Sequence, residues 1–368
     1  MAENPKISFK KEEGLDFTTV LRARVSSYFK DAKISSKANF LMCFKSIFLM
    51  GVAVVVYGLL LKFGSIGFGV LFALYGALAF CISIATMNIA HDALHSSYVS
   101  PSLGNRLLGF VMDLGGMSSF YWKKEHTVDH HSFTNIADHD ADLNVPIVLR
   151  LSPEAPYRSF HRFQHLYAPV LYSLNFIHWV YLSDIKRIYS ILTNKHSGGP
   201  IPSAKEVTFL FCFKFVHMFL FVVTPIIVLA LPWWQVVLGY IGFLSVAGIV
   251  VTTIFQLAHI VENVAFPVPG EDGKIDNSFL KHQLATTSNF ATKSKIIGFL
   301  FGGLNFQIEH HIFPHICHTH LYKISPIVRE TAREFGLPYY ENSSFFKAIR
   351  SHFRTLRRFG SGVTSNAS

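Results

Sequence analysis

Four apolar stretches, each long enough to cross a lipid bilayer, constrain the fold of this 368-residue chain more than any other feature. They lie near residues 40–61, 66–88, 207–230 and 233–256, and a membrane-spanning helix needs about 20 such residues. Only four residues separate the first two stretches, and little more than Pro232 separates the second two. The sequence therefore predicts an all-α, multi-pass membrane protein whose four transmembrane helices form two hairpins.

The overall composition supports this prediction and excludes several other classes of protein. Half of the residues are apolar and only 15% are charged, whereas soluble domains average about 25% charged residues. A nucleic-acid-binding protein would need a basic soluble domain, and a disulfide scaffold would need more than 4 cysteines. No apolar segment of the signal-peptide type precedes the first stretch, so we expect membrane insertion to begin at that stretch.

Lysine and arginine are concentrated outside the apolar stretches. Residues 1–39, 89–206 and 257–368 contain eight, ten and twelve of the 33 basic residues. Two hairpins would leave these three segments on one side of the membrane, and the positive-inside rule makes that side cytoplasmic. We therefore expect cytoplasmic termini and a single domain, in which hairpins 40–88 and 207–256 carry a helical cytoplasmic cap. The net charge of +10 then favours contact with anionic membrane lipid.

Histidines cluster in three short motifs on the predicted cytoplasmic side. The motifs are HDALH with His91 and His95, HTVDHH with His126, His130 and His131, and QIEHH with Gln307, His310 and His311. A further histidine, His259, ends the FQLAH segment of the fourth stretch. Helical residues four apart share a face, so we expect His126 and His130 to point together. By the same geometry His131 would point about 100° away.

Eight imidazoles are too many for one metal ion, because a catalytic zinc uses three protein ligands. They suit two ions with about four nitrogen ligands each. Imidazole binds iron, copper, zinc and nickel, so the ligand type alone does not choose the metal. Neighbouring carboxylates are candidates for orienting the rings, and these are Asp92, Asp129, Asp138, Asp140, Asp142 and Glu309.

These motifs closely resemble the three histidine boxes of the membrane-bound fatty acid desaturases, a diiron family. The boxes match as HDALH (91–95), HTVDHH (126–131) and NFQIEHHIFPHI (305–316), and the segments HSFTNIADHDAD, FHRFQHLYAPVLY and HQLATTSNFA match as well. The resemblance covers roughly residues 40–340. Gln307 stands where many members carry the first histidine of the third box, which resembles the front-end, Δ6-like subgroup and its bacterial linoleoyl-CoA type.

The resemblance implies four membrane helices and a cytoplasmic cap that holds two non-haem iron ions. The ligands that it implies are His91, His95, His126, His130, His131, His259, His310 and His311, with Gln307 at a further ligand position of the family. Second-tier candidates are His282, His315 and Asn305. We expect His139, His161 and His165 to be structural, although they lie in family-like segments.

The resemblance also implies the reaction. O2 and two external electrons would remove two hydrogens from adjacent methylenes of a long-chain, already unsaturated acyl group and leave a cis double bond. The sequence leaves open the position of that bond and whether the acyl group is held by CoA, a carrier protein or a glycerolipid. It contains no His-Pro-Gly-Gly motif of a fused cytochrome b5 domain. We therefore expect a separate donor of the ferredoxin or cytochrome b5 type with its reductase, and a bacterial inner membrane rather than the endoplasmic reticulum.

Two other functions fit parts of this pattern. A hydroxylase or ketolase of the same diiron class would need nearly the same residues, and its product would distinguish it. A metal-binding transporter would carry ionisable residues within its spans, because such residues mark ion pathways. In this sequence Lys45 and Lys214 lie near the ends of spans and His217 looks isolated, which favours an enzyme.

Overall fold

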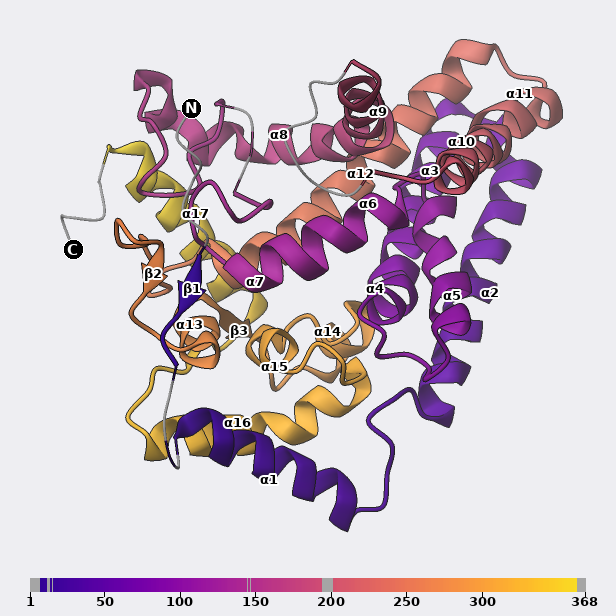
Figure 1. The fold of residues 1–368 in the computed structure, drawn as a ribbon. Helices are drawn as coiled ribbons and strands as arrows, with labels where there is room; N and C mark the ends of the chain where they lie inside the picture. The colour runs from indigo at the N-terminus through magenta and orange to yellow at the C-terminus, as the bar shows by residue number, and fades with distance from the viewer. Residues whose placement is uncertain are drawn as a thin grey trace. The chain divides into compact units, whose positions relative to one another are not determined.

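The computed structural model describes residues 7–11, 14, 16–143, 145, 147–193 and 201–362. The described part is mostly helical, with two short pairs of parallel strands (Figure 1). Its residues fall into two compact units. The membrane unit comprises Ala38–Lys124 and Pro169–Ile254, and the histidine unit comprises Met1–Lys37, Glu125–Ala168 and Phe255–Ser368.

Four helices are long and apolar enough to cross a membrane, in the predicted order along the chain: Phe40–Ile66, Phe68–Leu94, Ala204–Leu229 and Trp233–His259. Their parts are α2 (Phe40–Phe63), η1 (Gly64–Ile66), α3 (Phe68–Ala85), η2 (Thr86–Ala90), α4 (His91–Leu94), α10 (Ala204–Met218), η6 (Phe219–Val223), α11 (Thr224–Leu229) and α12 (Trp233–His259). Only Gly67 separates the first two spans. The prediction of an all-α membrane protein with four spans in two hairpins is therefore confirmed.

The second span is longer than the hydropathy predicts. Apolar character fades near Asn88, but the helix continues through the π-helical turn η2 into α4 and so includes His91. The buried amide of Asn88 donates a hydrogen bond of 2.8 Å to the carbonyl of Ile84. This bond gives the side-chain nitrogen of Asn88 a partner within the helix. The first four residues of the first histidine motif therefore continue the helix of the second span, and His95 directly follows its end.

A proline in the third span explains how the two hairpins bond inside the membrane unit. Pro225 has no N–H, so it leaves the carbonyl of Phe221, four residues earlier, without its helical partner. The hydroxyl of Tyr75 in α3 donates to that carbonyl at 2.7 Å, and Tyr57 in α2 donates to the carbonyl of Leu220 at 2.7 Å. In lipid each freed backbone group needs such an internal partner.

The structure corrects the expectation that His217 is isolated. In α10 its Nδ1 donates to the carbonyl of Leu114 at 2.9 Å, and its Nε2 lies 2.7 Å from the hydroxyl of Tyr240 in α12. One turn earlier, the ammonium of Lys214 lies 2.8 Å from the carboxylate of Asp184. His217 and Lys214 are thus both paired within the membrane unit. Sequence spacing did not show this because the partners lie far away along the chain.

Shorter helices complete the membrane unit. These are α5 (Ser102–Leu114), α6 (Ser119–Lys124), η5 (His178–Ser183), α9 (Asp184–Leu192) and the part of α8 (Gln164–Ile177) that begins at Pro169. Large apolar side chains remain exposed on the spans, among them Phe40, Ile47, Phe215 and Ile227. Contiguous apolar exposure of this kind is typical of lipid-facing helices.

The histidine unit is built from shorter elements. These are β1 (Ser8–Phe9), α1 (Phe17–Asp31), η3 (Glu125–His130), α7 (His131–Phe133), η4 (Ser159–Phe163), β2 (Lys274–Ile275), α13 (Phe279–Thr286), β3 (Ser288–Phe290), α14 (Lys295–Leu300), α15 (Gln307–Ile312), η7 (His318–His320), α16 (Leu321–Glu334), β4 (Tyr340–Asn342) and α17 (Phe345–Gly360). The strand pairs are β1 with β2 and β3 with β4. They place α15 beside β3 and α16.

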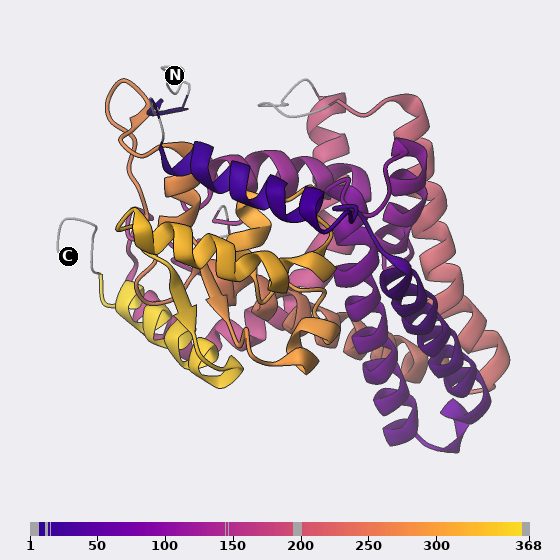
Figure 2. The same ribbon diagram turned by 90° about the horizontal axis from the view of Figure 1, so that it is seen from below.

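The core of the histidine unit forms where α1 lies along α16, as both ribbon views show (Figures 1 and 2). Phe17 and Leu21 of α1 pack with Ile324 of α16 and with apolar residues of α13 and α15. At the edge of this contact, Arg24 forms two hydrogen bonds, of 2.9 and 2.7 Å, to the carboxylate of Glu334. The N-terminal helix therefore covers one side of the elements that carry the third histidine motif.

Replacement of Gly248 in α12 tests the helix packing of the membrane unit. A Cβ at this position would lie 2.5 Å from the carbonyl oxygen of Tyr172 in α8, a backbone atom that cannot rotate away. We expect Gly248→Ala to destabilise the protein by about 1–3 kcal/mol, measured as a lower thermal midpoint in detergent. Gly58→Ala is the matched control, because no heavy atom lies within 4 Å of its Cβ position. Equal midpoints for the two variants would contradict this packing.

Candidate metal centre

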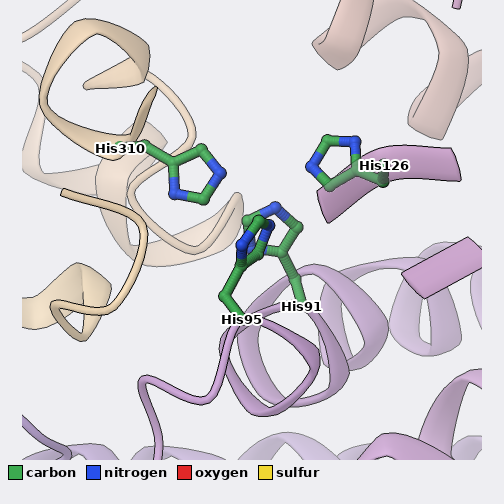
Figure 3. Close-up of side chains that lie close together, drawn as sticks. All are labelled: His91, His95, His126 and His310. Carbon is green, nitrogen blue, oxygen red and sulfur yellow. The ribbon is translucent and has the colours of Figure 1, made fainter. Parts of the chain in front are cut away.

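The first histidine motif presents two buried rings from one helix end. His91 begins α4 and His95 directly follows it, and their ring centroids lie 4.7 Å apart. Figure 3 shows the two rings side by side, as the spacing of four residues predicts. One ring nitrogen of each lies within 4.8 Å of the other. Trp122 packs edge-on against the ring of His91, at 5.6 Å between centroids.

A π-helical turn carries the second motif and changes its geometry from the α-helical prediction. In η3, the ring of His126 lies 5.2 Å from that of His130 and 4.8 Å from that of His131. The Nε2 atoms of His126 and His131 are only 3.3 Å apart. A π-helix has more residues per turn than an α-helix. The prediction that His131 points about 100° away is therefore wrong, because the wider turn brings positions i and i+5 together.

Three rings of the histidine unit, those of His126, His131 and His310, lie close together. His126 and His310 stack with centroids 6.3 Å apart, and both appear in Figure 3. The ring of His131 lies 4.7 Å from that of His310. Two nitrogens that bind one ion at about 2.1 Å lie about 3.0–3.4 Å apart. The separation of the His126 and His131 nitrogens fits this range, so these two rings suit a shared ion.

A second group contains one histidine from each of three segments. His130 of η3, His259 at the end of α12 and His311 of α15 each offer a ring nitrogen within 4.8 Å of the other two. The centroid of the His259 ring lies 4.7 Å from that of His130 and 4.7 Å from that of His311. All three side chains are buried. The sequence separates them by more than 50 residues, so only folding brings them together.

Hydrogen bonds fix the tautomer of each ring in this second group. The Nδ1 atom of His130 donates to Asp140 at 2.9 Å, that of His259 to the carbonyl of Thr286 at 3.4 Å, and that of His311 to Gln283 at 2.9 Å. A neutral ring whose Nδ1 carries the proton has a lone pair on Nε2. The Nε2 atoms of His130 and His259 are buried and have no hydrogen-bond partner among the described residues. This donor set fits a metal ion.

The carboxylate of Asp140 dominates the electrostatics around His130. Burial alone would lower the pKa of His130, but the negative charges of Asp140 and Asp142 outweigh burial and raise that pKa to about 9, so a metal ion that binds Nε2 would displace a proton from it. Both members of the His130–Asp140 pair are almost completely buried. A carboxylate that holds the far nitrogen of a ligating histidine orients the ring and increases its basicity. The prediction that Asp140 orients a ring is confirmed.

Two polar side chains that the sequence analysis did not single out brace this centre. The amide oxygen of Gln283 accepts from His311 and from the hydroxyl of Thr134 at 3.1 Å, and its nitrogen donates to the carbonyl of His131 at 2.8 Å. Asn135 donates to the carbonyls of His259 and Ala265, both at 3.1 Å. Neither residue sits in a histidine motif. The only sequence signal was their place in the HSFTN and HQLATTSN segments.

The structure corrects the expected role of Glu309. This fully buried carboxylate accepts from Asn289 at 2.8 Å and from the hydroxyl of Tyr339 at 2.7 Å, and it bonds no histidine ring among the residues that the structure describes. Burial raises the pKa of Glu309, while these two hydrogen bonds oppose the shift. Through these two bonds Glu309 anchors α15 to β3 and to Tyr339, the residue directly before β4. Neighbouring residues on a helix point about 100° apart, so Glu309 need not face the same side as His310.

The remaining candidates separate into buried and peripheral residues. Gln307 is buried at the start of α15, and its amide nitrogen has no hydrogen-bond partner among the described residues. Asn305 and His282 are also fully buried, and burial lowers the pKa of His282 to about 4. Within the described part of the chain, neither His282 nor His315 joins a group of three candidate ligands. His161 bonds the carbonyl of Ile147 at 2.7 Å, which is a structural role.

Comparison with known proteins identifies what this arrangement serves. The sequence profile described as "Fatty acid desaturase" matches residues 64–343, and therefore includes every histidine described above. The chain belongs to the fatty acid desaturase family. It is an oxidoreductase and a membrane protein, and its buried histidine groups are compatible with metal binding, as the resemblance implied.

Individual relatives match this desaturase over nearly its whole length. The chain is 33% identical to the sn-1 linoleoyl-lipid 6-desaturase of Synechocystis sp., over 96% of this chain and 98% of that protein. It is 33% identical to the protein of the same name from Arthrospira platensis, over 96% and 94%. It is 35% identical to the acyl-lipid (8-3)-desaturase of Physcomitrium patens, over 96% of this chain and 74% of the moss protein. All three relatives act on acyl lipids by name.

Substitution of Asp140 tests how the second group is held. We expect Asp140→Asn to weaken metal binding by about 10- to 100-fold, because the neutral amide no longer supports the basicity of His130. Metal retained after dialysis against graded chelator concentrations measures the effect. Asp138→Asn is the matched control, since Asp138 is exposed and has φ of 64°, a conformation that asparagine tolerates. If both variants retain metal as the wild type does, Asp140 has no such role.

Proposed function

We propose that this desaturase is a front-end acyl-lipid desaturase that inserts a cis double bond at the Δ6 position of a linoleoyl chain held in a membrane lipid. The observation that carries the proposal is the similarity to relatives named sn-1 linoleoyl-lipid 6-desaturase along almost the whole of both chains. The glutamine of QIEHH, Gln307, supports it as a feature of the front-end subgroup. One relative with a different named position, the (8-3)-desaturase of the moss, makes the position the point to test.

The centre that we propose holds two iron ions. His130, His259 and His311 would bind one ion, because the Nδ1 atoms of these rings are already hydrogen-bonded and the Nε2 atoms remain for a metal. Gln307, on the same helix as His311, would stand at a further ligand position. The second ion would take His126, His131 and His310 of the histidine unit, and the family resemblance adds His91 and His95 to the predicted ligand set. The close approach of the His126 and His131 nitrogens supports this division.

When bound, the iron ions would activate O2 for the removal of two hydrogens from adjacent methylenes. The chain supplies the conditions for that chemistry. Asp140, Gln283 and the carbonyl of Thr286 hold three rings in one tautomer, and the burial of the rings excludes bulk water. An unactivated methylene offers no polar handle, so we propose that an apolar tunnel selects the position along the acyl chain.

The electron balance requires a partner. Each turnover consumes one O2, two electrons and two protons, and it releases two waters with the alkene. We propose a separate one-electron carrier of the ferredoxin or cytochrome b5 type, with its reductase, as the source of the electrons. We also propose that residues 1–368 act as one catalytic domain whose termini and metal centre face the cytoplasm of a bacterial inner membrane. The positive-inside distribution of 33 basic residues supports this orientation.

A fatty acid profile of cells that express the chain tests the proposed function. With linoleate and a compatible electron carrier supplied, we expect a new triunsaturated acid whose added bond lies at Δ6, located by mass spectrometry. His310→Ala should abolish the product, because it removes one proposed ligand. His139→Ala should retain it, since the ring of this half-buried loop histidine bonds the carbonyl of Ala137 and lies outside the groups of candidate ligands found among the described residues. A hydroxylated acid would indicate the sister chemistry, and a bond elsewhere would contradict the Δ6 assignment.

Metal content tests the two-ion arrangement without any need for turnover. We expect purified protein to hold about two irons per chain, measured by elemental analysis. His259→Ala should reduce the content to about one, because it removes one of only three histidines from the second group. His315→Ala should leave the content unchanged, since His315 lies outside the groups described. Zinc in place of iron, or two irons in the His259 variant, would contradict the assignment.

A further inference from the structure

The outer face of α17 is the most basic surface among the helices of the histidine unit. The helix FFKAIRSHFRTLRRFG contains no acidic residue. Its exposed cations are Lys347, Arg350, Arg354, Arg357 and Arg358. At 100° per residue these five positions fall on an arc of about 100°. The buried residues, among them Ala348, His352 and Leu356, occupy the opposite side. One acidic group faces this arc, because Glu262 lies 3.7 Å from Arg354.

The buried face of α17 bonds directly to the segment that follows a proposed iron ligand. The Nδ1 atom of His352 donates to the carbonyl of Ile260 at 2.8 Å, one residue beyond His259. The hydroxyl of Ser351 accepts from the backbone N–H of Glu262 at 2.8 Å. Burial lowers the pKa of His352 to about 4, so this ring is neutral. A short path of covalent and hydrogen bonds therefore joins the inner side of the basic helix to His259.

The helix is held firmly in this position. The guanidinium of Arg150 donates to the carbonyl of Phe359 at 2.7 Å, and the amide of Gln164 donates to the carbonyl of Leu356 at 2.7 Å. Gly360 lies so close to the backbone of His161 that a Cβ would meet its carbonyl oxygen at 2.3 Å. A surface that is ordered before a partner arrives loses little entropy on binding.

We propose that the outer face of α17 is the docking surface for an acidic, one-electron carrier protein that reduces the metal centre. This inference rests on the proposed function, because that function requires external electrons. The charge of the face complements an acidic partner, and such complementarity steers association and sets the orientation of the docked protein. Phe346, at the start of the helix, is 80% exposed and supplies an apolar contact next to the cations. The carrier gives up one electron per docking event and leaves oxidised by one electron.

A charge-reversal variant tests the surface. Arg350→Glu, Arg354→Glu and Arg357→Glu are combined, and the matched control combines Lys293→Glu, Lys295→Glu and Lys323→Glu, three exposed residues of the same unit. The probe is an acidic [2Fe–2S] ferredoxin, with the soluble domain of an acidic cytochrome b5 in parallel. We expect the α17 variant to raise the Kd for the carrier, and the carrier KM, by about tenfold or more at low salt. The control should change both by less than about twofold.

Two further measurements separate the possible outcomes. Turnover with a small chemical reductant such as reduced methyl viologen, together with iron content, should be the same for wild type and α17 variant, because the metal centre is intact. Equal losses in the variant and its control, or a loss with the small reductant, would overturn the docking surface. So would a defect that follows the anionic lipid content of vesicles instead of the carrier. Wild-type protein that makes no product with the small reductant would count against the proposed function, whereas carrier binding by α17 would still be measured.

Discussion

The buried hydrogen bond between His130 and Asp140 holds one ring of the candidate metal centre and, through Asn135, is connected to a second. Both groups are almost completely enclosed, and removal of one partner from a buried charged pair typically costs about 3–5 kcal/mol. The same carboxylate accepts from the backbone N–H of Asn135 at 2.8 Å. Asn135 in turn donates to the carbonyl of His259. Through this chain of contacts one aspartate orients one proposed ligand directly and positions a second from another part of the sequence.

π-Helical turns occur next to proposed ligands and next to the proline of the third span. One turn, η2, precedes His91, and another, η3, contains His126 and His130. The wider turn leaves backbone carbonyls for side chains to bond and brings positions five apart together. In the third span the same device accompanies Pro225 and provides carbonyls for two tyrosines. At the second histidine motif this departure from α geometry brings the rings of His126 and His131 together, five positions apart in the sequence.

Helix α17 links the surface of the histidine unit to its interior. Its basic side faces solvent, while its inner side bonds the residues that follow His259. The reaction that we propose consumes external electrons, and it would need a place where a carrier can approach the candidate metal centre closely, because electron transfer slows steeply with distance. The net charge of +10 favours an acidic partner but does not locate its binding surface. Helix α17 gathers five of the cations on one face and so provides a candidate location.

The sequence alone determined the membrane character, the number and order of the spans, the family and the identity of the candidate ligands. Each of these depends on local patterns: runs of apolar residues, and histidines spaced three to five apart. Tertiary structure decided the grouping of His130 with His259 and His311, the bracing by Gln283 and Asn135, and the role of Glu309 as an anchor of α15. Those outcomes depend on π-helical turns and on contacts between residues that lie 20 to 152 positions apart in the sequence. Local spacing records neither, because a histidine pattern fixes which side chains share a helix face but not which other segments that face meets.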